Sequence, residues 1–505
     1  MTVGELLRTL APVMPPDQPL VLPAGNPALD VPCTGVTCDS RRASRGAIFV
    51  ALRGLKSDGA AFASEALANG AAAIVAGSHP DDRTDAPWVV VPDARLALAL
   101  LATEYHGHPS RQMQVVGITG TNGKTTTSYL INAIYEAAGV RCGLMGTVTY
   151  RIGDQEFAAT RTTPEAPELQ LLMRQMVAGG CGACVMEVSS HALALRRADG
   201  IRFAAGVFSN LTRDHLDFHA DMDDYFAAKR RLFEMLAPDA PAVINLDDPR
   251  GPGLAESVAH PVTYAINRAA DVTPGPLSFS LTGLDFDVRT PQGTVRLQSK
   301  LIGKPNVYNI LAAVGVTAAL GLPLDAIARG VRELRGVPGR FEVVSATGDD
   351  ITVLVDYAHT DDALRNLLET ARPLAARRLI TVFGAGGDRD RSKRPLMGMV
   401  AARLSDVVVI TSDNPRSEEP ERIIDEVQRG AAPETRQRGA EVVAIADRRE
   451  AILHAIAAAG AGDVVLVAGK GHEKYQEIGG QVLPFDDVAV AHEALAARRL
   501  KSRVG

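Results

Sequence analysis

Residues 113–138 read MQVVGITGTNGKTTTSYLINAIYEAA, and this stretch decides the fold class. The apolar run Met113–Ile118 predicts a buried strand, and Thr125–Ala138 predicts a helix. A glycine-rich turn lies between them, where successive backbone N–H groups and the helix N-terminus can face one anion. Lys124 places a positive charge at the β- and γ-phosphates, and the Thr125 hydroxyl can bind Mg²⁺. We therefore expect an ATP-binding loop made of Gly120, Thr121, Asn122, Gly123, Lys124, Thr125 and Thr126.

This loop is shorter than the general phosphate-loop pattern, which has a glycine where the chain has Ile118. What stands here is the form G-T-x-G-K-T. A plain strand-to-helix turn is the alternative interpretation. The placement of both Lys124 and Thr125 at the start of the helix favours the phosphate loop.

Length and composition narrow the class of protein. The chain has 505 residues, which at ~150 residues per domain suggests about three domains. Hydrophobic residues make up 46%, enough for several cores, so disorder is not expected. With 53 Lys and Arg against 59 Asp and Glu the net charge is −6, and a nucleic-acid partner is not expected because such proteins carry a basic stripe.

Cysteine usage and hydropathy favour a soluble cytoplasmic protein. Five scattered cysteines do not make a disulfide scaffold, and Cys181 and Cys184 form a lone C-x-x-C beside apparent strand interior. We interpret the cysteines as buried small thiols rather than zinc or redox residues. No apolar run reaches the ~18 residues of a membrane helix, so no membrane span is expected. The opening MTVGELLRTL has no basic stretch before a long apolar run, so no export signal is expected.

The pattern of expected strands, loops and helices divides the chain into three regions, 1–110, 111–337 and 338–505. The first holds short strand-like runs among Ala-rich helical stretches. The last repeats an apolar run, a polar loop with glycine and a helix, which predicts a parallel sheet covered on both faces. Pro338-Gly339 is the expected hinge before it. We predict an α/β fold of three domains with these limits. The expected strands are Ala47–Leu52, Ala73–Val75, Trp88–Val91, Met113–Ile118, Ile351–Val355, Leu379–Phe383, Val407–Ile410 and Val464–Val467.

Two polar loops offer further oxygen ligands for a Mg²⁺ bound to triphosphate. Glu187 follows an apolar run in the stretch MEVSSH, and residues 210–217 read NLTRDHLD. Either loop alone could be solvated surface. Their presence in the same region as a phosphate loop favours a role at the metal.

Four polar loops of the last region each follow a predicted strand directly. Because the carboxyl ends of parallel strands lie on one edge, these loops can converge on one crevice. Arg389 and Arg416 can each bind a carboxylate through two parallel N–H donors, and Glu473 can accept from an ammonium. The combination suits a diamino dicarboxylic acid. A surface arginine after a turn is the alternative for Arg416. The loops are 356–359 (DYAH), 384–390 (GAGGDRD), 412–416 (SDNPR) and 468–473 (AGKGHE).

The motifs GTNGKTT, EVSSH, NLTRDHLDFH, DYAH, GAGGDRD and DNPR follow one another across nearly the whole chain. In this order they resemble the Mur ligase family, the ATP-dependent amide ligases of peptidoglycan precursor synthesis. The resemblance implies an N-terminal α/β domain for the UDP end of the substrate, a central ATPase domain and a C-terminal Rossmann-like domain. Within the family the motifs are most similar to those of members that add meso-2,6-diaminopimelate to UDP-N-acetylmuramoyl-L-Ala-D-Glu. A monomer using ATP and two Mg²⁺ ions is expected.

The resemblance also assigns residues. Lys229 is similar to a lysine that relatives carry as a carbamate, which would bind a second Mg²⁺ beside His215. From the residues alone, Lys229 would be interpreted as part of a solvated helix face, and Asp39-Ser40-Arg41 as a β-turn with an exposed arginine. The resemblance implies that Lys124, Glu187, His215 and Lys229 are catalytic, that Thr125, Glu187, His215 and Lys229 bind metal, that Asn306, Arg340 and His359 contact ATP, and that Ser40, Thr162, Thr163, Ser189 and Arg197 contact the UDP-muramoyl substrate.

For the amino-acid substrate, the match covers Asp413-Asn414-Pro415-Arg416. Relatives that add lysine usually lack this arginine, because lysine has no second carboxylate, so Arg416 is the expected selectivity residue. Gly387 and Gly469 are expected to allow close backbone approach. The implied diaminopimelate site is Arg389, Asp413, Asn414, Pro415, Arg416, Gly469 and Glu473.

Four positions depart from patterns common in the family. Leu195 stands where some relatives have Gln, Arg161 where an Asn is frequent, and Pro305 where an aromatic is common. Asp361 replaces a frequent proline after His359, and Thr360 can cap the following helix instead.

The expected reaction has two steps: ATP phosphorylates the D-Glu carboxylate, and the amine of diaminopimelate then attacks the acyl phosphate. His215 or His359 is the expected base, and the residues do not choose between them. The alternatives are a lysine-adding ligase, a folylpolyglutamate-type ligase, which has no use for the first 110 residues, and a non-enzymatic nucleotide switch, which leaves the DNPR loop unexplained.

Overall fold

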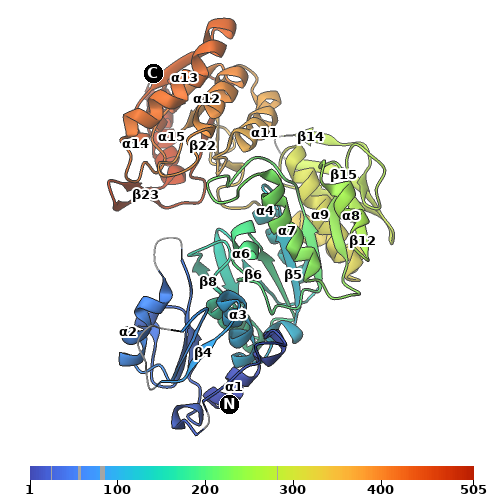
Figure 1. Ribbon diagram of the computed structural model, residues 1–505. Coiled ribbons are helices and arrows are strands. Elements are labelled where there is room, and N and C mark those ends of the chain that lie inside the picture. The colour runs from blue at the N-terminus through green and yellow to red at the C-terminus, as the bar shows by residue number, and fades with distance from the viewer. Residues whose placement is uncertain (24, 55–57, 80–85, 281–282, 505) are drawn as a thin grey trace.

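The computed structural model describes residues 1–23, 25–54, 58–79, 86–280 and 283–504. Three α/β bodies follow one another along the chain, from the N-terminal one in blue through the central one in green and yellow to the C-terminal one in orange (Figure 1). This arrangement confirms the predicted fold class. No helix in the described ranges has the length and apolar character to cross a membrane. The domain limits at 110/111 and 337/338 stay a prediction.

The N-terminal body is a four-stranded parallel sheet in the order β1-β2-β3-β4. Apolar side chains of α1 and α3 cover one face, and those of α2 cover the other. Asp93 caps α3 by accepting from the backbone N–H groups of Arg95 and Leu96. The elements are α1 Val3–Arg8, β1 Gly35–Thr37, β2 Ala47–Ala51, α2 Ala63–Ala68, β3 Ala73–Ala76, β4 Trp88–Val90 and α3 Ala94–Tyr105.

The central body is built on an eight-stranded sheet in the order β12-β11-β10-β5-β9-β6-β7-β8. Its strands are parallel from β12 to β6, and β7 and β8 extend the edge antiparallel. Helices α4, α9 and α10 cover one face, and α5 to α8 cover the other. The strands are β5 Gln114–Thr119, β6 Cys142–Met145, β7 Thr149–Ile152, β8 Gln155–Ala158, β9 Ala183–Glu187, β10 Ala205–Phe208, β11 Ala242–Asn245 and β12 Pro261–Tyr264. The helices are α4 Lys124–Ala137, α5 Ala166–Ala178, α6 Ser190–Ala194, α7 Met222–Glu234, α8 Gly251–Glu256, α9 Lys304–Ala319 and α10 Leu324–Glu333.

A small antiparallel sheet in the central body has no counterpart in the sequence predictions. It comprises β13 Thr273–Pro274, β14 Ser278–Ser280, β15 Gly283–Thr290 and β16 Gly293–Ser299. In β15 and β16 buried residues alternate with more exposed ones. A half-buried antiparallel sheet produces this pattern, whereas the predicted strands were recognised as continuous apolar runs.

The C-terminal body is a six-stranded sheet in the order β17-β18-β22-β19-β20-β21, parallel except for β17. Helices α11 to α13 pack on one face, and α14 and α15 on the other, which confirms the prediction of a parallel sheet covered on both sides. A hairpin of β23 and β24 is separate from the sheet. The strands are β17 Glu342–Val343, β18 Thr352–Asp356, β19 Leu379–Phe383, β20 Val407–Ile410, β21 Glu441–Ala444, β22 Val464–Ala468, β23 Tyr475–Ile478 and β24 Gln481–Pro484. The helices are α11 Asp361–Ala371, α12 Lys393–Leu404, α13 Pro420–Arg438, α14 Arg448–Ala458 and α15 Asp487–Val504.

The five cysteines are free thiols. Cys142, Cys181 and Cys184 are buried, as expected, while Cys33 and Cys38 are half-buried. Burial raises the pKa of Cys184 well above its usual value, because a thiolate is disfavoured away from water. The lone C-x-x-C is therefore part of the core, with Cys184 in β9 and Cys181 just before it.

Candidate functional site

The phosphate loop connects β5 to α4 in a conformation that requires its glycines. Gly120 and Gly123 have φ values of 147° and 86°, and a Cβ on Gly120 would lie 1.9 Å from the Ser209 hydroxyl. Lys124 folds back over the loop and donates from Nζ to the carbonyls of Gly120 and Thr121, at 2.9 and 2.8 Å. The predicted strand, turn and helix are all present.

The stretch after β10 fixes the outer side of this loop. Asn122 donates its backbone N–H to Asn210 Oδ1 at 2.9 Å, and Thr121 donates its N–H to the Asn210 carbonyl at 2.9 Å. The Thr212 N–H donates in turn to Thr121 Oγ1 at 3.0 Å. Three hydrogen bonds thus join two motifs that lie about ninety residues apart in the chain.

Glu187 ends β9, the strand beside β5, with Ile118 as its register partner. The carboxylate is buried and accepts from the N–H of Thr147 at 2.8 Å and from its hydroxyl at 3.0 Å. Glu187 also opposes the fall in the pKa of Lys124 that burial of that ammonium causes. The acid therefore lies close enough to the phosphate loop for its charge to act there.

Lys229 lies on α7, and only 1% of it is exposed. The interpretation from the residues alone, a solvated helix face, is wrong because the side chain points inward, donating to the Gly120 carbonyl at 2.8 Å and lying 4.3 Å from the Tyr225 ring centre. Burial, helped by the nearby charge of Lys124, places the pKa of Lys229 well below its usual value. A neutral amine is thus favoured under the phosphate loop.

His215 belongs to the stretch after β10, and its φ of 55° lies in the left-handed backbone region. Its ring packs against His191, with 4.9 Å between centroids, and its Nε2 lies 3.3 Å from Asp214. Burial holds the pKa of His215 well below its usual value, although Asp214 opposes the shift. The imidazole is neutral at pH 7 and can accept a proton or bind a metal.

Four of the five residues predicted for the UDP-muramoyl substrate gather beside β9. Thr163 donates its hydroxyl to the Glu187 carbonyl at 2.8 Å and accepts from the Ser189 N–H at 3.1 Å. Arg197 donates to the Thr163 carbonyl at 3.3 Å, and Thr162 Oγ1 lies 3.1 Å from the hydroxyl of Thr147.

Ser40 lies apart from them, in the N-terminal body. It is buried, and its hydroxyl donates to Glu65 at 2.6 Å. Arg41 beside it is exposed, as predicted, and paired with Asp39, but the segment Ser40–Arg42 is a short 3₁₀ helix capped by Asp39 rather than a β-turn.

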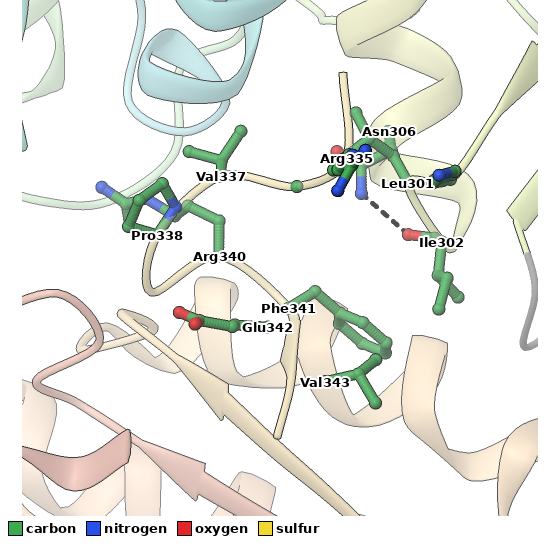
Figure 2. A pocket seen from close by; sticks show the side chains of 12 residues that line it. Leu301, Ile302, Asn306, Arg335, Val337, Pro338, Arg340, Phe341, Glu342 and Val343 are labelled. Carbon is green, nitrogen blue, oxygen red and sulfur yellow. Dashed lines mark hydrogen bonds between the residues drawn. The ribbon is translucent and has the colours of Figure 1, made fainter. Parts of the chain in front are cut away.

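The predicted nucleotide contacts lie at the junction of the central and C-terminal bodies. Arg340 donates to the Thr125 hydroxyl at 3.2 Å and lies over the Tyr357 ring. His359 holds its Nδ1 2.9 Å from the Tyr357 carbonyl, and burial lowers the pKa of His359. Asn306 donates to the Ile302 carbonyl at 2.8 Å (Figure 2).

A cavity of about 350 Å³ opens at this junction. Figure 2 shows the connecting segment that contains Pro338 crossing it, with Asn306 on one side and Phe341 on the other. The predicted hinge therefore borders a space of ligand size. Its lining consists of Lys300, Leu301, Ile302, Asn306, Arg335, Gly336, Val337, Pro338, Arg340, Phe341, Glu342 and Val343.

The departures from the family pattern have local explanations. Pro305 lies in the first turn of α9, where its missing N–H has no intrahelical partner to lose. Thr360 caps α11 by accepting from the Ala363 N–H at 3.2 Å, as predicted. Arg161 donates to Glu165 at 2.7 Å, and Leu195 is the C-cap residue that follows α6.

Beyond the hinge, polar contacts join the central and C-terminal bodies around the phosphate loop. Asn122 donates to Asp362 at 3.2 Å, and Arg213 lies 3.4 Å from Asp390. Asp362 follows the DYAH motif, and Asp390 belongs to the GAGGDRD loop. Asn122 of the nucleotide loop is thus bonded to the first turn of α11, and Arg213 of the adjoining stretch to the GAGGDRD loop.

The predicted amino-acid residues converge at that edge. Lys470 is fully buried and donates from Nζ to Asn414 Oδ1 at 3.0 Å and to Glu473 Oε2 at 2.9 Å. Asn414 also donates to Glu473 at 2.9 Å. A Cβ on Gly469 would lie 2.7 Å from Asp413 Oδ2, so the close approach expected there is present.

The two predicted carboxylate-binding arginines lie against the same glycine-rich loop. A Cβ on Gly386 would lie 3.1 Å from Arg416 Nη1 and 3.8 Å from Arg389 Cγ. Gly387 packs against Pro415, where a Cβ would come within 1.9 Å of the carbonyl oxygen. The GAGGDRD and DNPR loops are therefore in direct contact, and the Arg416 guanidinium lies against the glycine-rich loop, while the exposed Arg389 guanidinium donates to the Asp388 carbonyl at 3.2 Å.

Sequence reasoning missed three side chains that organise the site: Thr147, Lys470 and Arg448. Arg448 is fully buried, pairs with Asp487 at 2.7 Å and donates to the Ser412 carbonyl at 3.2 Å. Lys470 was visible within the polar GKGHE loop, but its burial was not. The other two lie outside every motif and carried no local signal.

Family models match the chain in three segments. Residues 32–106 match the model described as Mur ligase family, catalytic domain, 118–317 the Mur ligase middle domain, and 339–471 the Mur ligase, glutamate ligase domain. A relative from Gloeobacter violaceus is 48% identical over 471 residues, 93% of this chain and 95% of its own. The chain belongs to the Mur ligase family.

Other Mur ligases show the same relationship. A relative from Syntrophomonas wolfei is 47% identical over 93% of this chain and 96% of its own. Both relatives bear the name UDP-N-acetylmuramoyl-L-alanyl-D-glutamate–2,6-diaminopimelate ligase. A solved structure titled with that ligase name superposes with a TM-score of 0.68 at 35% identity, covering 99% of each chain.

The candidate donors for Mg²⁺ are oxygen and nitrogen atoms around the phosphate loop. Among the described residues, no group of three or more His, Cys, Asp or Glu side chains is placed to hold a metal by itself. The Glu187 carboxylate and the Thr125 hydroxyl are hard oxygen donors of the kind that Mg²⁺ prefers. An ammonium at Lys229 would repel a cation, whereas a carbamate there would supply two more oxygens. The residues fit Mg²⁺ when phosphate oxygens of a bound nucleotide complete the set.

Proposed function

We propose that the protein is an ATP-dependent ligase that joins meso-2,6-diaminopimelate to the D-Glu carboxylate of UDP-N-acetylmuramoyl-L-Ala-D-Glu. The reaction would serve cytoplasmic peptidoglycan precursor synthesis, and with it cell-wall biogenesis, cell shape and division. The names of relatives that match nearly the whole chain support this substrate pair. One structural observation carries it furthest: the phosphate loop is hydrogen-bonded to Asp362 at the sheet edge that presents Arg416 and Glu473.

The first step forms an acyl phosphate and ADP. The loop Gly120–Thr126 binds the phosphates of ATP, and Lys124 exchanges its contacts with two loop carbonyls for the transferring phosphoryl oxygens. Mg²⁺ supplies charge neutralisation and would be held by Thr125, Glu187, His215 and Lys229 as a carbamate. Asn306, Arg340 and His359 position the nucleotide from the hinge side.

The second step is attack of the diaminopimelate amine on the acyl carbon, with release of phosphate. The amine must be neutral, so a base is needed. His215 and His359 are the two candidates; burial lowers the pKa of both, which keeps each imidazole unprotonated but makes it a weaker proton acceptor, and a His215 that holds Mg²⁺ cannot serve as the base at the same time. Closure of the C-terminal body on the central one would exclude water from the acyl phosphate.

Substrate selection follows from the charges at the two ends of the site. Arg416 and Arg389 bind the carboxylate of the distal centre of diaminopimelate, and Glu473, already oriented by Lys470, accepts from its ammonium. Asp413, Asn414, Pro415 and Gly469 shape the pocket. At the other substrate, Ser40 would contact the uridine end, and Thr162, Thr163, Ser189 and Arg197 the muramoyl-peptide portion.

The decisive assay measures amino-acid-dependent ADP release with the UDP-muramoyl dipeptide and a panel of diamino acids. We expect turnover with meso-diaminopimelate and much less with lysine. Faster turnover with lysine would favour the lysine-adding alternative. Turnover on a folate in place of the UDP-dipeptide would favour the folylpolyglutamate type. The same preparation on a sizing column tests the expected monomer.

A further inference from the structure

The β23–β24 hairpin is a direct support of the loop that carries Arg416. Gln476 donates from Nε2 to the Asp413 carbonyl at 2.8 Å, and the Glu477 N–H donates to Asn414 Oδ1 at 3.0 Å. Successive residues of β23 therefore bind successive residues of the DNPR motif. A strand added beside a loop in this way fixes its backbone.

The backbone of Arg416 is fixed by the same hairpin. Its N–H donates to the Glu477 carbonyl at 2.9 Å, and its carbonyl accepts from the Gly479 N–H at 2.7 Å. These bonds hold Arg416 at a φ of 54°, in the left-handed region that non-glycine residues rarely adopt. The conformation depends on main-chain atoms of the hairpin, and a side-chain substitution at Glu477 leaves those bonds in place.

The side chain of Glu477 forms an ion pair with the Arg416 guanidinium. Its Oε2 lies 3.3 Å from Arg416 Nε, while Arg416 Nη1 donates to the Gly387 carbonyl at 2.7 Å. The Arg416 side chain is 20% exposed and that of Glu477 34%. A bidentate carboxylate needs two parallel N–H donors on one edge of the guanidinium, and the edge that contains Nε already has an internal carboxylate on it.

We propose that Glu477 is a specificity-determining residue, an internal carboxylate that the distal carboxylate of the incoming diamino acid must displace from Arg416. The inference rests on the proposed function, because it takes Arg416 to be the residue that binds this carboxylate.

Two consequences distinguish this role from a merely structural one. A dicarboxylic amino acid competes with Glu477, since two carboxylates close together on one guanidinium repel each other. Lysine has no second carboxylate and does not displace Glu477 from Arg416. The guanidinium therefore keeps its counter-charge when lysine is bound. Removal of the Glu477 charge therefore favours diaminopimelate and gives lysine no advantage.

The test is steady-state kinetics of the full-length protein and its Glu477→Gln variant with each amino acid, at saturating ATP and UDP-dipeptide. We expect the KM for diaminopimelate to fall only about threefold, because a partly exposed ion pair contributes little free energy. The value of kcat/KM for lysine should not rise. Glu493→Gln is the matched control, because it removes a carboxylate paired with an exposed arginine, Arg449, in the same C-terminal body. It should leave both KM values unchanged.

An unchanged or higher KM for diaminopimelate in Glu477→Gln would overturn the inference. Glu477→Ala is the second variant if the amide side chain perturbs folding, since it keeps the same main-chain bonds, and its KM should fall in the same direction. Failure of the proposed function looks different: the unsubstituted protein would then show no ADP release with diaminopimelate.

Discussion

Arg340 donates a hydrogen bond from Nη2 to the hydroxyl of Thr125 at 3.2 Å, although the two residues are 215 positions apart in the chain. The same guanidinium lies over the Tyr357 ring, 4.5 Å from its centre. A residue just past the hinge thus reaches the first turn of α4, where a nucleotide phosphate is expected. Arg340 therefore connects the C-terminal body to the phosphate loop through a direct hydrogen bond.

Substitution of Arg340 by Ala should therefore weaken ATP binding. We expect the KM for ATP to rise about tenfold, since a charge-assisted contact and a stacking contact are both lost. Arg340→Lys should recover only part of this, because an ammonium keeps the charge without the flat face. Initial rates at varied ATP measure the effect, and Arg332→Ala on α10 is the control. An unchanged KM for ATP would remove Arg340 from the nucleotide site.

Much of the fold could be predicted because its signals are local. The strands Leu379–Phe383 and Val407–Ile410 have the bounds predicted from their apolar runs. The phosphate loop was recognisable because strand, glycines, lysine and helix follow within a few residues. The β13–β16 sheet was missed, because β15 and β16 alternate buried with more exposed residues and so give no continuous apolar run.

The site was less accessible to sequence reasoning, because its key contacts are long-range. Lys229 and Gly120 are 109 positions apart, and no pattern around Lys229 shows that it points inward. The burial of Lys470 follows from the loops that close over it. Most residues assigned through the family resemblance lie in the clusters described above, Ser40 lies apart in the N-terminal body, and the roles of all of them stay predictions.

Lys124→Ala tests the phosphate loop. We expect amide formation to fall at least about a thousandfold, because the charge that neutralises the transferring phosphoryl group is lost. The fold should survive, since the contacts of Lys124 are to two carbonyls of its own loop. Coupled ADP release and a thermal unfolding curve measure the two properties. Substantial turnover in this variant would refute the assignment.

Lys229→Ala tests the carbamate. The pKa of Lys229 lies well below its usual value because the ammonium is buried, which favours the neutral amine that can attack CO₂. We expect loss of activity by about a hundredfold or more, with partial recovery on adding short-chain carboxylic acids. Native mass spectrometry should show the added CO₂ on the unsubstituted protein. Full activity of a preparation without that mass would contradict the modification.

His472 should make stability depend on pH. Its ring packs 5.0 Å from that of Tyr357, and burial lowers its pKa to about 4. An unfolded chain takes up this proton near pH 6.5, so the contribution of His472 is complete above that pH and is lost as the pH falls toward 4. His472→Gln should flatten the fall in melting temperature between these pH values. A slope equal to that of the unsubstituted protein would show that other groups cause it.

Arg448 and Asp487 form an ion pair in which both side chains are fully buried, 2.7 Å apart. Arg448 also donates to the carbonyls of Ser412 and Ala468, the first residues of two loops of the amino-acid site. Arg448→Met should cost about 3–5 kcal/mol, because it leaves the Asp487 carboxylate buried without a counter-charge. Denaturant unfolding measures this loss.

The neighbouring Arg449 provides the control for this pair. Arg449 pairs with Glu493 on the surface, so Arg449→Met should cost at most about 1 kcal/mol. The double variant Arg448→Met, Asp487→Leu should regain much of the lost stability, because no buried charge is left unpaired. Its KM for diaminopimelate should nevertheless be higher than that of the unsubstituted protein, since the carbonyls of Ser412 and Ala468 have lost their donor. Recovery of both stability and KM would show that Arg448 supports the core without positioning the loops.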